Sequence, residues 1–141
     1  MNRLKTENVL IFGKKNEKID GVKQILTEHF NHIFLNSSLS KIGARFPDDH
    51  FRVIIVTDSL KYTLNKDLLY GLRTLFPKAK VICLVDQITQ KIEMDLRSAS
   101  LVFLGSYDYF GKHYRDIIVS ALKSARFNQL SPSSTGRINV S

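Results

Sequence analysis

The sequence of 141 residues has little of several features that would indicate a specialised class of protein. It contains one cysteine, so an internal disulfide is excluded, and Cys83 lies inside an apolar run where a buried, reduced thiol is expected. No apolar run approaches the ~18 residues that a membrane span needs, and the N-terminus lacks the apolar core of a signal peptide. We therefore expect a cytoplasmic protein with no membrane contact.

The sequence also lacks the spacing that metal sites and phosphate loops require. The four histidines do not follow any metal-ligand pattern and no second cysteine can help them, so a zinc site is not expected. The run Gly13-Lys14-Lys15 follows an apolar stretch but lacks the Gly-x-x-x-x-Gly-Lys-Ser/Thr frame of a nucleotide loop. It also lacks the hydroxyl-rich loop of a flavodoxin. We predict no cofactor and no enzymatic activity, although a small flavodoxin-like binder or enzyme remains an alternative.

The charge balance is strongly basic, with 21 Lys and Arg residues against 13 Asp and Glu residues and a formal net charge of +8. An excess of this size favours acidic partners such as nucleic acid or an acidic protein face. The basic residues are spread over the whole chain, so the charge alone does not identify such a partner.

Apolar runs and amphipathic segments alternate five times along the chain. The clearest run is Val53-Ile54-Ile55-Val56, four β-branched residues that lead into Thr57 and Asp58. Such a run is typical of a strand buried on both faces of a parallel sheet. The pattern predicts strands over residues 8–13, 32–35, 51–57, 81–85 and 101–105, and helices over residues 17–30, 39–44, 65–76, 88–96 and 114–127.

This alternation predicts right-handed βαβ units and therefore an α/β fold. Five units in this length match a three-layer, flavodoxin-like (βα)5 sandwich whose parallel five-stranded sheet has the order 2-1-3-4-5. We expect one domain over residues 1–127. Residues 128–141 are rich in Ser, Pro and Gly and are predicted to form a linker or tail.

Several short motifs resemble the receiver domain of bacterial response regulators, above all the NarL/LuxR-type transcription regulators. The residues at 76–84, Phe-Pro-Lys-Ala-Lys-Val-Ile-Cys-Leu, resemble the family's stretch before and through strand four. Those at 96–100, Leu-Arg-Ser-Ala-Ser, resemble its Leu-Arg-Ala-Gly-Ala. The Leu-Ser-Pro at 130–132 resembles the start of the linker toward a helix-turn-helix domain. The resemblance implies that DNA is contacted only through such a domain, which is not present in this chain.

Receivers transfer a phosphoryl group onto an aspartate at the end of strand three, and the resemblance implies which residues would do so here. The family's two Mg²⁺-binding acids correspond to Gly13 and Lys14, its acceptor to Thr57, and its hydroxyl after strand four to Val85. None of these can hold a divalent cation in the usual way. Asp58 follows the acceptor position by one residue, and because side chains along a strand alternate, it reaches the pocket only if the loop redirects it.

The position of the family's lysine after strand five depends on the register. Counting forward from Leu96 places Gly105 or Ser106 there, whereas counting backward from the last helix makes Lys112 a possible pocket lysine. The forward register is favoured because loops absorb insertions more readily than sheets do. The phosphorylation pocket is degenerate in either register.

An unusually aromatic segment, residues 107–114, follows the fifth strand. In receivers, the face formed by helix four, strand five and helix five carries dimer and output contacts, and this segment falls on it. The resemblance implies an interaction face that includes Leu96, Arg97, Tyr107, Tyr109 and Arg115. Simple packing over the end of the strand is an equally good explanation of the aromatic residues.

These observations favour a pseudo-receiver of a two-component-type transcription regulator, working as a phosphorylation-independent module. We expect a homodimer through the face described above, or a partner protein. The alternative is an atypical receiver that a histidine kinase still phosphorylates on Asp58, in which case Mg²⁺ would be needed.

Overall fold

The structure, a computed structural model, describes residues 8–58, 66–96 and 101–130. Within these residues five strands form one parallel sheet in the order β2-β1-β3-β4-β5. The strands are β1 (Asn8–Phe12), β2 (His32–Asn36), β3 (Val53–Thr57), β4 (Lys80–Val85) and β5 (Phe103–Ser106). The predicted fold class and strand order are confirmed.

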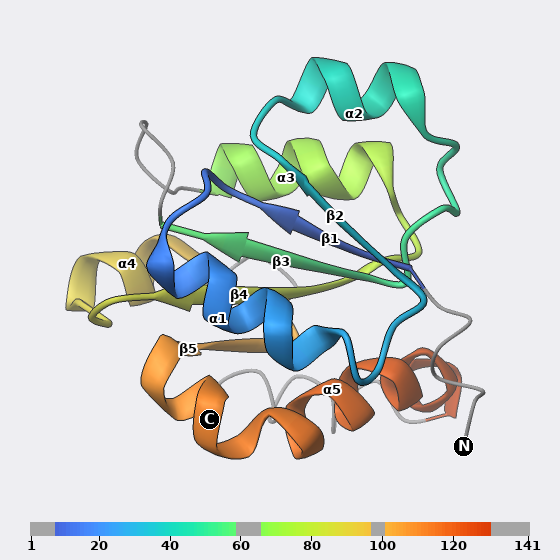
Figure 1. The fold of residues 1–141 in the computed structure, drawn as a ribbon. Helices are drawn as coiled ribbons and strands as arrows, with labels where there is room; N and C mark the ends of the chain where they lie inside the picture. Colours follow the sequence, from blue (N-terminus) through green and yellow to red (C-terminus); the bar gives the residue numbers. More distant parts are fainter. Residues whose placement is uncertain (1–7, 59–65, 97–100, 131–141) are drawn as a thin grey trace.

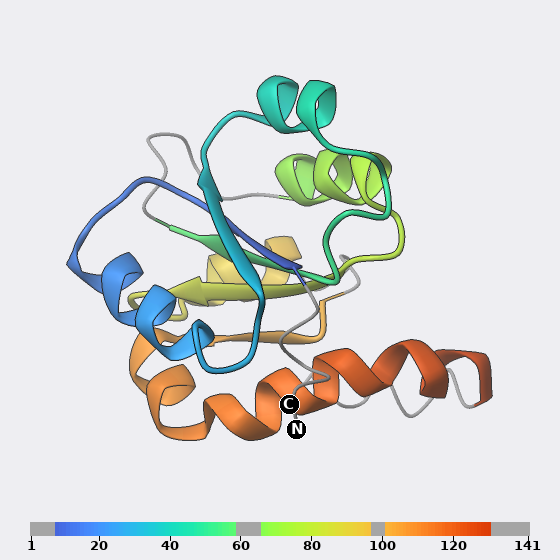
Figure 2. The same cartoon turned by 45° about the vertical axis from the view of Figure 1, so that its right-hand side comes forward.

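Helices cover both faces of the sheet and make three layers (Figures 1 and 2). One face carries α1 (Glu17–Leu26) and α5 (Tyr107–Leu130). The other carries α2 (Leu39–Arg45), α3 (Lys66–Leu75) and α4 (Gln90–Leu96). No helix in the described part of the chain is both long and apolar enough to cross a membrane.

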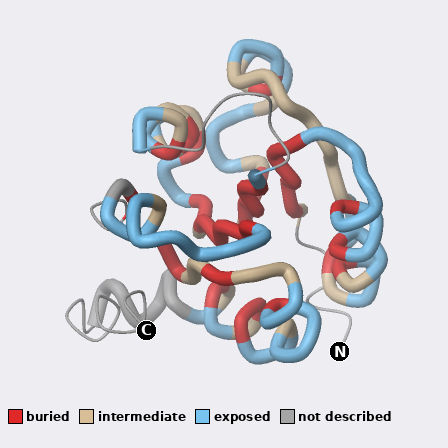
Figure 3. The backbone as a smooth tube through the Cα atoms, turned by 90° about the vertical axis from the view of Figure 1, so that its left-hand side faces the viewer, coloured by how far each residue is buried: buried red, intermediate tan, exposed pale blue. Residues whose placement is uncertain are grey.

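The two faces of the sheet bury two separate cores, which meet in the central strands. All five residues of β3 are buried; Val53 and Ile55 pack toward α1 and α5, and Ile54 and Val56 pack toward α3 and α4. This alternation follows from the period of two along a strand. Figure 3 shows the buried strands at the centre and the exposed outer sides of the helices around them.

Local side-chain contacts explain where several helices begin. The Asn16 side chain accepts a hydrogen bond of 2.8 Å from the Ile19 backbone N–H and caps α1, while Ser38 caps α2 by accepting from the Lys41 N–H. Such caps satisfy backbone donors that have no partner within the helix. The cap places the basic loop at residues 13–15 directly between β1 and α1.

The last helix differs most from the prediction. It begins at Tyr107 rather than at residue 114, because the Ser106 hydroxyl accepts a hydrogen bond of 3.0 Å from the Tyr109 N–H and caps an additional first segment. A kink at His113, with φ −126° and ψ 21°, separates this segment from the predicted helix. The helix also continues to Leu130, three residues past the predicted end at 127. The remainder of the predicted linker, residues 131–141, lies outside the described residues.

Two smaller boundaries also differ. α1 ends at Leu26, where the prediction extended it to residue 30, because the His29 N–H bonds to the Leu26 carbonyl and tightens the chain into a turn. β5 begins at Phe103, two residues after the predicted start. Its pairing with β4 aligns Leu84 with Gly105, so the structure has the forward register of this strand.

Candidate functional site at the carboxyl edge of the sheet

Asp58 follows β3 directly, and both of its carboxylate oxygens accept hydrogen bonds. The Asp86 backbone N–H donates to Oδ2 and the Tyr107 hydroxyl donates to Oδ1, each over 2.8 Å. The Asp58 N–H itself donates to the Leu84 carbonyl over 3.2 Å. The carboxylate therefore joins the carboxyl ends of β3 and β4 to the start of α5.

Thr57, at the position that corresponds to the acceptor, is the last residue of β3 and is completely buried. Its hydroxyl donates to the Phe12 carbonyl over 3.3 Å and so ties the end of β3 to the end of β1. Gly13 follows β1, and its N–H donates to the Asn36 carbonyl. Val85 is the buried last residue of β4. The hydrogen bonds of Thr57 and Gly13 thus connect neighbouring strands at the carboxyl edge of the sheet, and Val85 is packed in the core there.

Basic side chains border the two acids at this edge. Lys18, in the first turn of α1, forms an ion pair with Asp86, and its amine lies 5.4 Å from the centre of the Tyr107 ring. Lys14 is exposed in the loop after β1. Because both partners of the ion pair are half exposed, it adds little to stability. Its effect is to place a positive charge where a cation-binding site would need a negative one.

Tyr107 is held in its neutral form. Burial of the hydroxyl and, secondarily, its hydrogen bond to the Asp58 carboxylate raise the pKa of Tyr107, with a smaller opposing contribution from Thr57. Burial also raises the pKa of Cys83, on β4, to about 12, and the negative charge of Asp58 adds to this shift. Both shifts keep a proton on a neutral group near Asp58.

We expect alkaline pH to weaken the fold partly through Tyr107. The pKa of this phenol is raised above 10.0 in the folded state, so the folded state holds the proton more tightly than the unfolded state does. Its contribution is complete below about pH 10 and is lost as the pH rises toward the folded pKa. Urea unfolding at increasing pH should show a smaller loss for Tyr107→Phe than for the wild type. Parallel curves for the two proteins would contradict this expectation.

The residues at this edge do not fit the Mg²⁺ site that the receiver fold implies. The loop after β1 offers Gly13 and Lys14 in place of carboxylates, Asp86 is paired with Lys18, and both Asp58 oxygens are already hydrogen-bonded. Among the described residues, no group of three or more His, Cys, Asp or Glu side chains is placed to hold a metal. Oxygen ligands in that number are what Mg²⁺ requires.

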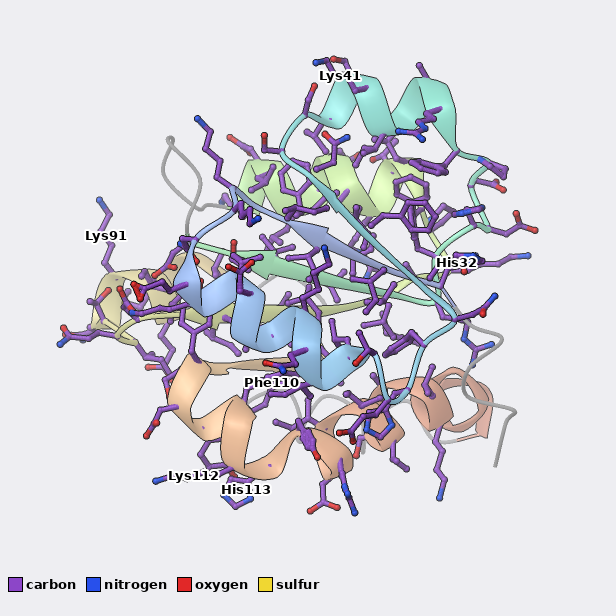
Figure 4. The ribbon with its side chains drawn as sticks, in the orientation of Figure 1. His32, Lys41, Lys91, Phe110, Lys112 and His113 are labelled. Atoms are coloured by element: carbon purple, nitrogen blue, oxygen red, sulfur yellow. The ribbon has the colours of Figure 1, made fainter. Side chains whose placement is uncertain are left out.

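The structure corrects the suggestion that Lys112 is a pocket lysine. Lys112 lies in α5, is exposed, and its amine is 3.7 Å from the carboxylate of Asp108, one helical turn earlier. Figure 4 shows it pointing outward from α5. The forward register instead places Gly105 inside β5, where it is buried. β5 is therefore a continuous strand without an insertion. The residues between it and the predicted start of the last helix form the first segment of α5.

The residues predicted for the interaction face occupy different environments. Leu96 is 1% exposed and belongs to the core, so it does not present a surface to a partner. Tyr107 is half-buried and points to Asp58. Tyr109 is 50% exposed, and Arg115 is exposed with its guanidinium near the Tyr114 ring. Arg97 lies outside the described residues. Only Tyr109 and Arg115 thus have the exposure that such a face needs.

Sequence reasoning missed the contact between Tyr107 and Asp58. The two residues are 49 positions apart in the chain and come from strand ends that are separated by β4. The available signal was that both residues follow predicted strands, because the carboxyl ends of parallel strands meet at one edge of the sheet.

A groove of about 440 Å³ lies beside this edge, between the outer side of β5 and α5. Its walls include Tyr109, whose ring stacks on Phe103 at 5.7 Å and lies 4.3 Å from the ring of His113. Gly105 permits this arrangement, because a Cβ atom there would come within 2.3 Å of the Phe103 ring. The groove falls on the predicted interaction face.

Comparison with known proteins reveals likeness in structure only. No protein-family model matches the chain, and no curated protein matches its sequence. Among solved structures, a signal receiver domain of an HD-domain protein from Pseudomonas fluorescens has a TM-score of 0.73 at 11% identity, covering 90% of this chain and 94% of its own. A CheY-like receiver domain from Methanospirillum hungatei has a TM-score of 0.70 at 16% identity, covering 85% and 96%.

The third structure is the RcsB response regulator of Salmonella typhimurium. It has a TM-score of 0.69 at 15% identity, and the match covers 85% of this chain but 61% of RcsB. Identities this low establish shared architecture, with the strand order and helix placement described above. The chain has the fold of the CheY-like receiver domains of response regulators.

Proposed function

We propose that this chain is a pseudo-receiver: a receiver-fold module that has lost phosphoryl transfer and works as an interaction module of a transcription regulator, without enzymatic activity. The observation that carries the proposal is the hydrogen bonding of the Asp58 carboxylate. Its two oxygens accept hydrogen bonds from Tyr107 and from the Asp86 backbone, so the carboxylate is a structural anchor. Phosphorylation would have to break the bond from Tyr107 and find charge compensation elsewhere.

The surroundings of Asp58 support the same conclusion. A transferring phosphoryl group must be neutralised by a hard cation and by positioned donors. The loop after β1 offers no carboxylate, and Val85 at the end of β4 offers no hydroxyl. Lys112, which the backward register would have supplied, is paired with Asp108 on the outside of α5. Three of the groups that the reaction needs are thus replaced by residues that cannot perform their roles.

Two observations support a position in a transcription regulator. The Leu-Ser-Pro at 130–132 resembles an interdomain linker, and the chain spans 61% of RcsB, whose structure was determined in the context of DNA interaction. We infer that the output of this module is set by self-association or by a partner protein at the face formed by α4, β5 and α5.

The experiment is to incubate the protein with Mg²⁺ and either acetyl phosphate or beryllofluoride. Intact mass and backbone amide shifts are then compared with those of an active receiver treated in the same way. We expect the active receiver to show an adduct and this chain to show neither a mass increase nor shifts around Asp58. A stable adduct on Asp58 would establish the alternative, an atypical receiver with a working acceptor. That alternative draws its support from the exposure of Asp58 at the carboxyl edge of the sheet.

A further inference from the structure

Basic residues gather at the amino edge of the sheet, opposite to the edge that holds Asp58 (Figure 1). Three segments meet there: the start of β3, the turn from α3 into β4, and the second half of α5. Residues 50–57, 68–85 and 117–123, which include these segments, contain five basic residues and no Asp or Glu: Arg52, Arg73, Lys78, Lys80 and Lys123. The fold therefore brings to one edge charges that are far apart in the sequence.

Hydrogen bonds hold these three segments together. The Lys80 N–H donates to the Arg52 carbonyl over 2.9 Å, and the main chains of neighbouring strands lie about 5 Å apart. The Arg52 guanidinium donates to the Leu122 carbonyl of α5 over 2.9 Å. A tight turn after α3 brings Arg73, in the last turn of that helix, toward the start of β4. Two arginines and a lysine from different elements are thus fixed close to one another.

This basic cluster, Arg52, Arg73 and Lys80, is short of negative charge. All three residues are half-buried, and in the described part of the chain neither Arg52 nor Lys80 forms an ion pair. Burial and, secondarily, the positive charges of Arg73 and Arg52 lower the pKa of Lys80, so the neighbouring charges that act on it repel it. A partly buried charge is costly unless it is paired. An anion bound here would therefore be stabilised by the whole cluster.

Helix dipoles do not account for the whole basic cluster. Arg73 lies in the last turn of α3, where the helix dipole favours a positive charge. Arg52 and Lys80 lie at the starts of strands, and strands have little net dipole. The bond to the Leu122 carbonyl uses one N–H of the Arg52 guanidinium, and the other donors of this group can bind a ligand. The cluster thus has both the charge and the donors that an anion needs.

We propose that the amino edge around the basic cluster binds phosphate groups, and that its ligand is the phosphate backbone of a nucleic acid. Arginine pairs with two phosphate oxygens at once, and lysine adds a point charge. A DNA duplex carries a negative charge for about every 1.7 Å of its axis, so it can meet several of the five basic residues together. Protein surfaces usually mix charges of both signs, which suits an edge without acids less well.

The first test measures the binding of a labelled DNA duplex to the full chain by fluorescence anisotropy at about 50 mM salt. We expect a Kd of about 1–100 μM for the wild type and at least about tenfold weaker binding for Arg52→Gln/Lys80→Gln. The charge-matched control is Lys41→Gln/Lys91→Gln, which removes two exposed charges on α2 and α4 (Figure 4) and should weaken binding by no more than about threefold. A wild type that does not bind, or equal losses in the two double variants, would overturn the proposal.

The salt dependence of the same binding counts the phosphate contacts. Each contact adds about 0.9 to the slope of the logarithm of affinity against the logarithm of salt concentration. The loss of two contacts in Arg52→Gln/Lys80→Gln should therefore make the slope shallower by about 1.8. In Lys41→Gln/Lys91→Gln the slope should change by less than half of that. If both double variants have equally shallow slopes, binding follows net charge alone and the assignment of the amino edge is wrong.

Lys80→Gln alone separates a loss of binding from a loss of folding. Because the pKa of Lys80 is lowered in the folded state, folding disfavours its charged form. Removing this charge should leave the urea midpoint unchanged or raise it. The same substitution should weaken DNA binding by about threefold or more, since one phosphate contact is lost. A Lys80→Gln protein that binds DNA as tightly as the wild type would contradict the proposal.

Two competitors distinguish the DNA backbone from other anions. Pyrophosphate offers the same phosphate chemistry in a small ion, and polyglutamate offers carboxylates on a protein chain. We expect unlabelled DNA to displace the labelled duplex at far lower concentrations than either competitor. If polyglutamate binds as tightly as DNA and depends equally on Arg52 and Lys80, the ligand is an acidic protein and the proposal fails. If pyrophosphate binds at this edge and DNA does not, the site takes free phosphate only, and the proposal fails as well.

Backbone amide shifts locate the contact. We expect added DNA to shift the amides of Arg52, Lys80 and Lys123 at the amino edge and to leave those around Asp58 unchanged. Shifts confined to the carboxyl edge would overturn the proposal. This contact with nucleic acid goes beyond the proposed interaction module. It does not depend on whether Asp58 accepts a phosphoryl group, which the adduct experiment decides by itself.

Discussion

Replacing Phe51 with alanine is expected to lower the free energy of unfolding by about 3–5 kcal/mol. Phe51 precedes β3 and is 1% exposed. Its ring meets those of Phe34, Phe46 and Phe76 edge-on at centroid distances of 5.5, 5.0 and 5.1 Å. Removing it leaves a cavity that these rings cannot fill without leaving their own positions. Because a domain of this size is stabilised by only about 5–15 kcal/mol, the loss should be conspicuous.

Urea or guanidinium unfolding measures this loss, with Tyr70→Ala as the matched control. Tyr70 is an aromatic residue on α3 that is 75% exposed, so its removal should change the unfolding free energy by no more than about 0.5 kcal/mol. If Phe51→Ala proves too unstable to purify, Phe51→Leu keeps most of the volume and should cost about 1–2 kcal/mol. A Phe51→Ala protein as stable as the Tyr70 variant would mean that the aromatic cluster is not packed as described.

The strands of the fold could be predicted more fully than the beginning of the last helix. The β-branched run ending at Val56 is apolar at every position, which only a strand covered on both faces tolerates, and β3 lies there. The first segment of α5 could not be predicted in the same way. Its cap, Ser106, and its first core residue, Phe110, lie between the predicted end of the strand at residue 105 and the predicted start of the helix at residue 114. Phe110 lies in the first segment of α5, one turn before Tyr114, and is completely buried.

The sequence predicted which residues occupy the candidate site, but it did not predict the contacts between them. The resemblance to receivers, aligned on the predicted strand ends, indicated Gly13, Lys14, Thr57 and Val85, because positions next to apolar strands are well determined by the strands themselves. The bond from Tyr107 to Asp58 crosses the end of β4, and no local pattern encodes it. Lys112 was misplaced as a candidate for a related reason, since spacing in the sequence does not reveal which strand end an additional helical segment follows.

The remaining large effect concerns Asp58 itself. Asp58→Ala is expected to lower the free energy of unfolding by about 1.5–3 kcal/mol, because the bonds to a charged acceptor from the Asp86 N–H and the Tyr107 hydroxyl are both lost. The half-buried phenol is then left without its partner. Chemical denaturation near neutral pH measures the change. Tyr107→Phe removes only one of the two bonds and should cost about 1 kcal/mol.

The sign of the Asp58 effect distinguishes an anchor from a member of an acid cluster. Where several carboxylates share a site, removing one relieves repulsion, so the same substitution would stabilise the fold. Here we expect Asp58→Ala to destabilise it, and the double variant Asp58→Ala/Tyr107→Phe to be less unstable than the sum of the single variants, since both disrupt one bond. Asp108→Ala, which breaks an exposed ion pair on α5, is the control and should cost less than about 0.5 kcal/mol. A stabilising Asp58→Ala substitution would mean that this carboxylate is under electrostatic strain and does not anchor α5.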